Sequence, residues 1–420
     1  MTHVLESQII ESLRNGIPPQ RGVDRYSVGN ENLIDGMNKY HLSQIRDVGK
    51  IRFISGSWGG GKTHFFRIIR DLAFQENCIV SNVELTKDSA PFNKFEQVFY
   101  SIVRNISTPE FYQEIMSGDV IPFGSLVEES LRHLGGSQPE VSGDITHEQF
   151  TNAVEKLMVN KGIDIDFKKM IQHYWQTYLP ESAERAAVEQ TRAEILQWFA
   201  GEGTIGLYRK HFGVNKVVAR QNAKIMLQSL AEFVKLAGYR GLLILFDETE
   251  QTYSIMRKSA LKDAHNNLLS LINNIEMISG IFLIYATTPD FFTDPKHGIV
   301  SYGALFGRIG KPENRLPKAL DTIWNLDAVA PRLQDYQEAA IKIRNIYCAA
   351  FPEYQNTIAD ETMTVQFVKE LFQKHPKLSA MRFWRVMVTA LIRRYDSEME
   401  GEEISTERVY DDIMDRLRED

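Results

Sequence analysis

The chain has 420 residues, which is enough for two or three domains, or for one large domain that carries an insertion. Hydrophobic residues make up 43% and charged residues 25%, as in an ordinary globular protein, and the two cysteines exclude a disulfide scaffold or a cysteine metal site. A net charge of −7 excludes a polycation that coats nucleic acid, although local basic patches remain open.

The N-terminal stretch, residues 1–16, predicts an amphipathic helix. Acids interrupt its apolar positions, whereas a signal peptide has a continuous apolar core. Nowhere in the sequence does an apolar run approach the ~18 residues of a membrane span. We therefore expect a protein of the cytoplasm that makes no membrane contact.

Apolar runs at residues 50–54, 78–83, 241–246 and 280–286 predict buried parallel strands, and residues 322–326 are a fifth candidate. Helical patterns lie between these runs, as a doubly wound sheet requires. The fold class that we expect is α/β, with a parallel sheet that is covered by helices on both faces.

A long helical interval, residues 108–236, separates the second strand from the third. Helical patterns lie at residues 111–116, 147–160, 167–178, 183–200 and 216–237, and glycine-rich breaks at residues 135–139 and 201–203 interrupt them. We interpret the interval as a helical insertion in the domain that contains the sheet. An independent helical domain is the alternative.

The C-terminal part after Pro331 is helical in pattern, at residues 335–351, 361–374 and 378–395, which predicts a small helical domain. Residues 396–420 hold eleven acids and three arginines. Because like charges repel and stay in water, we expect this last segment to be a solvated helix or tail.

The stretch Gly56-Ser57-Trp58-Gly59-Gly60-Gly61-Lys62-Thr63 matches the phosphate-loop pattern G-x-x-x-x-G-K-[ST], between a strand and a helical pattern. Backbone N–H groups that curl round a polyphosphate form an anion nest, and the N-terminus of the following helix adds its positive dipole end. Glycine permits the unusual φ angles of such a turn. The alternative is a glycine turn that binds nothing.

Each side chain of this stretch has an expected role. Lys62 would place its ammonium at the β- and γ-phosphates, and the Thr63 hydroxyl would bind Mg²⁺. The ring of His64 would pack, because its backbone N–H faces phosphate. The residues that we expect to contact ATP in the loop are Gly56, Trp58, Gly59, Gly60, Gly61, Lys62, Thr63 and His64.

An acid pair, Asp247-Glu248, follows the third strand, which is the Walker B pattern. Asp247 would hold Mg²⁺, directly or through water, and Glu248 would orient and deprotonate the attacking water. An acid pair after a strand can also be a helix N-cap or a surface turn, so its meaning depends on the phosphate loop.

The fourth strand ends in Thr287-Thr288-Pro289, and an arginine, Arg308, follows it. A hydroxyl at that strand end can hydrogen-bond the γ-phosphate or the water. Thr288 is the first candidate and Thr287 the second, and a turn that merely ends the strand is the alternative. Arg308 is a candidate arginine finger for a neighbouring subunit, or a surface arginine in an ion pair.

Arg382 lies in the last predicted helix and would reach the γ-phosphate from a helical lid. The stretch from Lys377 to Arg394 contains five basic residues and no acid. It could instead touch the backbone of a nucleic acid, or pair with the acidic tail.

The order of these elements is similar to that of AAA+ ATPases of the origin-recognition type: phosphate loop, Walker B strand, polar strand end, arginine, and helical lid with arginine. Residues 237–250, 288–292 and 302–308 more closely resemble the ATP-binding proteins of BREX phage-defence systems, of the BrxD type. Residues 15–19 and 28–29 resemble the segment of that family that lies against the base, so Ile17 and Val28 are expected contacts.

The resemblance covers nearly the whole chain, with departures at Asn30, where related ATPases usually have arginine, and at Trp58 inside the loop. It implies a P-loop AAA+ core, ATP and Mg²⁺ as cofactors, and defence against phage together with a helicase or other DNA-handling components.

We therefore expect a Mg-ATP-dependent ATPase that forms a homo-oligomer and acts on DNA or on a DNA-bound partner. Two hypotheses of another class remain: an ATP-gated switch with negligible turnover, and an adaptor that recruits proteins through the insertion. The expected domains are residues 1–49 (N-terminal helices and base segment), 50–107 and 237–330 (two halves of the core), 108–236 (insertion), 331–395 (lid) and 396–420 (acidic tail or helix).

Overall fold

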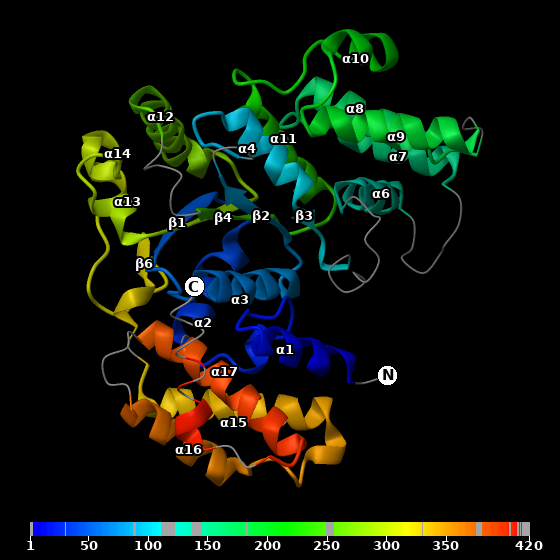
Figure 1. Cartoon of the computed structure of the whole chain (residues 1–420). Coiled ribbons are helices and arrows are strands. Elements are labelled where there is room, and N and C mark those ends of the chain that lie inside the picture. Colours follow the sequence, from blue (N-terminus) through cyan, green and yellow to red (C-terminus); the bar gives the residue numbers. More distant parts are fainter. Residues whose placement is uncertain are drawn as a thin grey trace.

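Six strands form one sheet in the middle of the computed structural model, which describes residues 3–29, 31–86, 90–110, 122–136, 145–180, 184–248, 256–329, 331–374, 380–402, 405–409, 411 and 413 (Figure 1). The strands are β1 (Lys50–Ser55), β2 (Ile79–Leu85), β3 (Ile106–Ser107), β4 (Leu242–Glu248), β5 (Ile281–Thr287) and β6 (Ile323–Asn325). Their order is β3-β2-β4-β5-β1-β6, in which β3 is antiparallel to β2 and the other pairs are parallel.

The five strands expected from the sequence are all present close to their predicted bounds, and the α/β class is confirmed. The short strand β3 was missed because a pair of residues is too short to show any hydrophobic period.

Two hydrophobic cores lie on opposite faces of the sheet. Along β4, Ile244 and Phe246 belong to one core, whereas Leu243 and Leu245 belong to the other, as the alternation of side chains along a strand requires. The helices beside the first face are α4 (Phe95–Arg104), α11 (Ala223–Leu236) and α12 (Lys258–Asn274), and those beside the second are α2 (Glu31–Tyr40) and α3 (Lys62–Gln75). Helices on both faces explain why the central strands β4 and β5 read as nearly continuous apolar runs.

The insertion consists of helices that extend the first core away from the sheet (Figure 1). They are α6 (Pro122–Gly135), α7 (His147–Val159), α8 (Ile165–Gln176), α9 (Arg185–Phe199) and α10 (Ile205–Phe212). Buried residues of these helices and of β2, β4 and β5 form one continuous hydrophobic cluster. The insertion therefore shares its core with the sheet.

The helices of the insertion differ from the predicted ones at several places. The helix predicted at residues 216–237 begins only at Ala223, because the Ala219 N–H donates to the Asn222 side-chain oxygen at 2.7 Å, so it does not make the first bond that a helix from residue 216 would need. Helices α6 and α10 were not predicted. The helix predicted at residues 111–116 lies outside the described residues.

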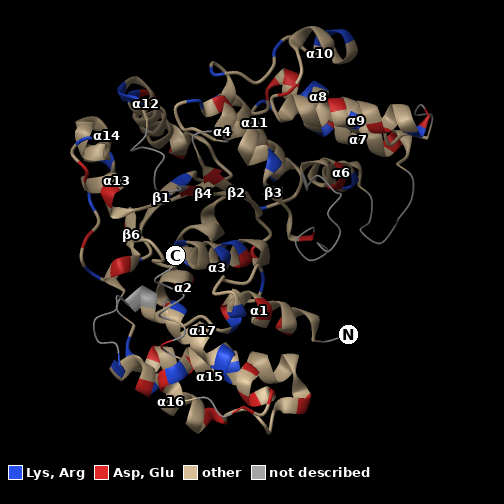
Figure 2. Ribbon diagram, viewed as in Figure 1, with Lys and Arg blue, Asp and Glu red and all other residues tan. Residues whose placement is uncertain are grey.

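The remaining helices are α13 (Pro289–Thr293) and α14 (Gly303–Ile309), which follow β5, and α1 (Val4–Arg14), α15 (Leu333–Ala350), α16 (Glu361–Lys374) and α17 (Ala380–Met399). Short 3-10 turns are η1 (Val23–Arg25), η2 (Leu42–Gln44), η3 (Ile275–Met277), η4 (Ile299–Ser301), η5 (Leu326–Ala328) and η6 (Pro352–Tyr354). Figure 2 shows basic and acidic residues interspersed along the C-terminal helices.

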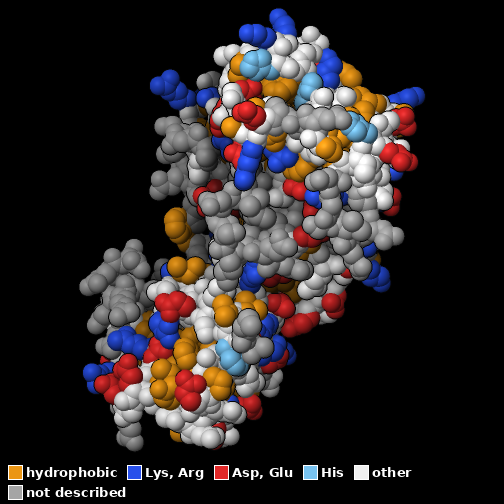
Figure 3. Space-filling model, turned by 90° about the vertical axis from the view of Figure 1, so that its right-hand side faces the viewer, with side chains coloured by type: hydrophobic (Ala, Val, Ile, Leu, Met, Phe, Trp, Pro, Cys, Tyr) orange, Lys and Arg blue, Asp and Glu red, His pale blue; other side chains and the backbone are white. Residues whose placement is uncertain are grey.

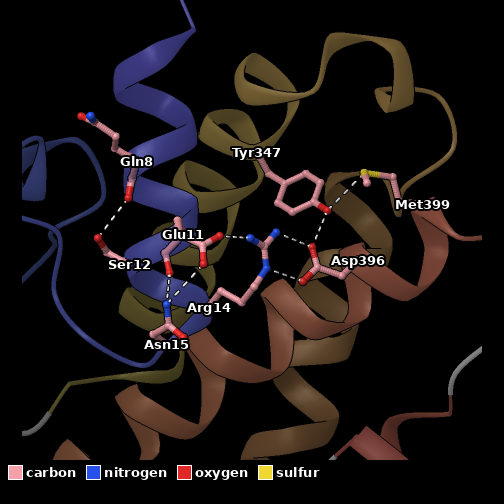
Figure 4. Close-up of polar contacts among 8 residues, drawn as sticks. All are labelled: Gln8, Glu11, Ser12, Arg14, Asn15, Tyr347, Asp396 and Met399. Atoms are coloured by element: carbon pink, nitrogen blue, oxygen red, sulfur yellow. Dashed lines mark hydrogen bonds and ion pairs between the residues drawn. The ribbon is translucent and has the colours of Figure 1, made fainter.

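The first helix belongs to the C-terminal helical unit. Ile9, Ile10 and Leu13 of α1 are buried in the same cluster as α15, α16 and α17. Arg14 forms a two-pronged ion pair with Asp396 of α17, with both N···O distances at 2.8 Å, and the Tyr347 hydroxyl donates to the same carboxylate at 2.8 Å (Figure 4). The two ends of the chain are thus joined by apolar packing and by an ion pair.

The acidic segment from Asp396 was expected to be a solvated helix or tail, and most of its described residues are exposed or half-exposed, but two of its apolar residues are not. Asp396 lies inside α17, and Val409 and Ile413 are buried in the C-terminal core, 0% and 3% exposed. Apolar side chains spaced among the acids hold the segment against the helices, which the charge count alone did not reveal.

Candidate nucleotide-binding site

The glycine-rich loop joins the end of β1 to the start of α3. Gly59 and Gly61 have φ angles of 68° and 77°, in the left-handed region that favours glycine. A Cβ atom on Gly60 would lie 2.6 Å from the Ser57 carbonyl oxygen, so only glycine fits there without a shift of the backbone. The glycines therefore allow a turn that is too tight for other residues.

The loop ends at a helix N-terminus that suits an anion. Gly61 is the N-cap of α3, and neither a side-chain cap nor an acid occupies the first turn. The first N–H groups of a helix have no acceptor within it, and the helix dipole adds positive charge there. The backbone of this loop and helix thus fits the phosphates of a nucleotide.

The Lys62 ammonium lies over the loop. Its side chain is buried, and Nζ donates to the carbonyl oxygens of Gly56 at 2.7 Å and Ser57 at 3.0 Å. These bonds hold the positive charge inside the curve of the turn. A phosphate oxygen could accept the same hydrogen bonds.

Asp247, near the end of β4, lies close enough to Lys62 for their charges to interact. Burial raises the pKa of the Asp247 carboxyl, the Lys62 ammonium opposes this rise, and Glu84 on the neighbouring strand β2 adds to it. The fold therefore brings together the cation and the acid that the sequence pattern placed far apart in the chain.

The donor set fits Mg²⁺ held mainly by nucleotide and water. Thr63 is exposed in the first turn of α3, so its hydroxyl is accessible. Within the described residues, no group of three or more His, Cys, Asp or Glu side chains could hold a metal ion. One hydroxyl, one carboxylate, phosphate oxygens and water are a common magnesium arrangement in P-loop proteins.

The polar ends of β4 and β5 lie at the same edge of the sheet as the loop. Glu248 is the last residue of β4, and its side chain lies outside the described part of the chain. Thr287 is buried and its carbonyl accepts from the Gly56 N–H at 3.1 Å, while Thr288 is the half-buried N-cap of α13. Parallel neighbours that end together explain this convergence.

Of the two candidate arginines, the structure describes the side chain of one only. Arg308 is exposed on α14, and within the described residues it forms no ion pair. Arg382 lies in α17, and its side chain is outside the described part.

The segment expected to contact the base runs from α1 toward α2. Ile17 is 53% exposed, and Val28 is half-buried against the C-terminal core. The His64 ring packs against this segment, with Nε2 2.9 Å from the Ser27 hydroxyl oxygen and the ring edge-on to Tyr26. Burial lowers the pKa of His64 to about 4, so the ring is neutral at neutral pH.

Sequence reasoning missed two further features, one in the loop and one just before it. Ser57 donates to the Asp327 carboxylate through both its backbone N–H and its hydroxyl. Ser55, the last residue of β1, has a buried hydroxyl that makes no hydrogen bond within the described residues. The one available signal for Asp327 was its position just after the fifth predicted strand.

A mostly parallel sheet, a glycine-rich loop at its carboxyl edge and an acid beside the loop lysine are consistent with the core of a P-loop nucleotide-binding protein. The chain belongs to the family of BREX system ATP-binding proteins BrxC/D, whose model matches residues 3–414. Among curated proteins, no sequence matches it.

The family match confirms the resemblance carried by residues 237–250, 288–292 and 302–308, and it supports ATP as a ligand of the protein. Within the described residues, no helix has the length and apolar character needed to cross a membrane.

Proposed function

We propose that this protein is a Mg-ATP-dependent ATPase with an AAA+ core that acts in BREX phage defence. The observation that carries the proposal is the glycine-rich loop that holds the buried Lys62 ammonium at the start of α3, near enough to Asp247 for the two charges to interact. Family membership supports ATP as the nucleotide. The expected reaction is hydrolysis of ATP to ADP and phosphate.

The loop residues bind the substrate in this mechanism. Backbone N–H groups of the loop and of the first turn of α3 hold the phosphates, and Lys62 exchanges its carbonyl acceptors for a phosphate oxygen. Thr63 and Asp247 would hold Mg²⁺, which neutralises phosphate charge when it is bound. Trp58 can be accommodated in the loop because its side chain points outward, 75% exposed.

The chemical step is assigned to the strand ends. The Glu248 carboxylate takes a proton from the attacking water as the water oxygen bonds to the γ-phosphorus and the bond to the ADP oxygen breaks. Thr288, or Thr287 as second choice, hydrogen-bonds the γ-phosphate or the water. Arg382 would approach the γ-phosphate from the C-terminal helices.

The protein is proposed to work as a homo-oligomer, with Arg308 reaching the nucleotide of a neighbouring subunit. Its exposure on α14 supports that role, since a side chain that serves another subunit must be accessible. DNA, or a helicase or other DNA-handling protein, is the proposed target of the assembly. On the face drawn in Figure 3, basic and acidic side chains are mixed over the insertion and the C-terminal helices.

The test is a pair of measurements on wild type, Lys62→Ala and Glu248→Gln: calorimetric titration with Mg-ATP, and steady-state hydrolysis with and without double-stranded DNA. Wild type should bind and hydrolyse ATP. Lys62→Ala should lose binding, and Glu248→Gln should bind ATP but hydrolyse it on the order of 10²-fold more slowly.

Each outcome separates the hypotheses. No heat with folded wild type would remove the whole proposal. Tight binding with background turnover, even with DNA, would favour an ATP-gated switch or adaptor. Unchanged turnover in Glu248→Gln would remove the role given to that carboxylate.

A further inference from the structure

An aspartate far along the chain is bonded to the phosphate loop. The Asp327 carboxylate accepts the Ser57 backbone N–H, at 2.9 Å and 3.1 Å from its two oxygens, and the Ser57 hydroxyl at 2.7 Å. Ser57 is the second residue of the loop, and Asp327 lies in η5. Hydrogen bonds to a charged acceptor are the stronger kind.

The sheet explains why these two residues meet. Strand β6 runs parallel to β1, with Asn325 opposite Ser55, so the segments that follow the two strands leave the sheet at the same edge. Asn325 then holds Asp327 in place, because its side-chain oxygen accepts the Asp327 N–H at 3.2 Å. The Asn325 amide donates to the Glu313 carbonyl at 2.9 Å, which ties η5 to the segment after α14.

Ser57 is the point at which the bonds of the loop converge. Its carbonyl accepts from the Gly60 N–H at 2.8 Å and from the Lys62 ammonium at 3.0 Å. Its N–H and hydroxyl are both taken by Asp327. The position of Ser57 therefore sets both the curvature at Gly60 and the place of the ammonium.

The N–H that Asp327 occupies is not offered to a phosphate, and a carboxylate near the binding site also repels one. The bond to Asp327 offsets this repulsion because it fixes the loop before the nucleotide binds. Ordering a flexible turn on binding would instead cost conformational entropy. A loop that is already held in shape binds its ligand more tightly for that reason.

We propose that Asp327 is a positioning residue for the phosphate loop, which it holds through Ser57 in the shape that receives the nucleotide phosphates. This inference rests on the proposed ATP binding. It adds a residue outside the loop, two positions beyond the end of β6, to the parts that determine nucleotide affinity.

Nucleotide affinity gives the first test. Asp327→Ala should raise the Kd for both Mg-ATP and ADP by about tenfold, because hydrogen bonds to a charged group are lost. KM should rise with kcat nearly unchanged, since the loop holds the phosphates equally in ground and transition states. Asp327→Asn, which keeps an acceptor oxygen, should recover most of the affinity.

A matched control removes the same charge at the same edge of the sheet. Asp290 is exposed in α13, and its side chain makes no bond within the described residues, so Asp290→Ala should leave the Kd unchanged. If Asp327→Ala binds as wild type does, the positioning role is overturned while ATP binding stands. Tighter binding by Asp327→Ala than by wild type overturns it as well, because the carboxylate would then act by repulsion.

A second readout needs no nucleotide. Trp58 follows Ser57 and is 75% exposed, so its fluorescence anisotropy, isolated by subtracting the Trp58→Phe protein, reports the motion of the loop. Anisotropy should fall in Asp327→Ala and recover in Asp327→Asn. An unchanged value would overturn the positioning role of Asp327 even if ATP binds. If wild type binds no nucleotide, the calorimetry removes both proposals.

Discussion

At the scale of single residues, the site is determined by backbone more than by side chains. Gly60 lies against the Ser57 carbonyl, and Gly59 and Gly61 hold left-handed conformations. These requirements follow from geometry, and the sequence pattern alone already indicated them. The contacts of Ser57 with Asp327 could not be predicted, because no local pattern connects residues that meet only after the strands pair.

Gly60→Ala tests the cradle. Its Cβ would lie 2.6 Å from a backbone oxygen that cannot move away as a flexible side chain could, so the loop must change shape. We expect the affinity for Mg-ATP to fall by about tenfold or more, measured by calorimetry, because the loss of one charged hydrogen bond alone is that large.

The control for this substitution is Gly206→Ala in α10, where a Cβ would meet nothing within 4 Å. Gly206 is exposed in the first turn of α10 and alanine is a better helix former than glycine, so this variant should unfold no more easily and bind ATP normally. Equal ATP affinity in the two variants would show that the phosphates do not occupy the loop.

At the scale of elements, strands were easier to predict than the boundaries of helices. The central strands β4 and β5 are buried on both faces and show as apolar runs, and shorter apolar runs marked the other three, so all five were predictable. The start of α11 was not, because the Asn222 side chain bonds the backbone of Ala219 and Val217 in place of the first helical hydrogen bonds. Likewise, the acids after Asp396 suggested a solvated segment, although the segment starts inside α17 with a partly buried ion pair.

The pairing of α1 with α17 can be measured through Asp396→Asn. This change removes the charge that Arg14 and Tyr347 share, in a site where Arg14 and Asp396 are 34% and 28% exposed (Figure 4). We expect a loss of about 1–2 kcal/mol in the free energy of unfolding, measured by urea denaturation. The coupling in a double-mutant cycle with Arg14→Ala should be of similar size.

Glu11 provides the control because it pairs with the same arginine but is 62% exposed (Figure 4). Glu11→Gln should cost less than about 0.5 kcal/mol, since exposed pairs within a helix contribute little. If the two substitutions cost the same, the two-pronged bond would not hold the ends of the chain together.

At the scale of the whole molecule, the parts of the proposed ATPase site come from different regions of the fold. The loop, Asp247 and the ends of β4 and β5 lie at one edge of the sheet, and the C-terminal helices are attached through the chain that follows η5. Arg308 is on α14, which packs against α12, and its side chain is exposed. An exposed arginine on a rigid element suits a role in a second subunit better than one in its own.

Mixing two inactive variants tests that arrangement. Arg308→Ala and Glu248→Gln should each hydrolyse ATP about 10²-fold or more slowly than wild type, because each removes a group that acts in the transition state. If Arg308 acts on a neighbour, a mixed oligomer contains interfaces where an intact arginine meets an intact glutamate. ATPase activity should therefore rise on mixing and pass through a maximum as the ratio is varied.

Arg185→Ala, at an exposed arginine paired with Glu189 in the insertion, should hydrolyse ATP as wild type does. Full activity of Arg308→Ala alone would make the residue a surface arginine, and the absence of rescue at every ratio would place its action within its own subunit.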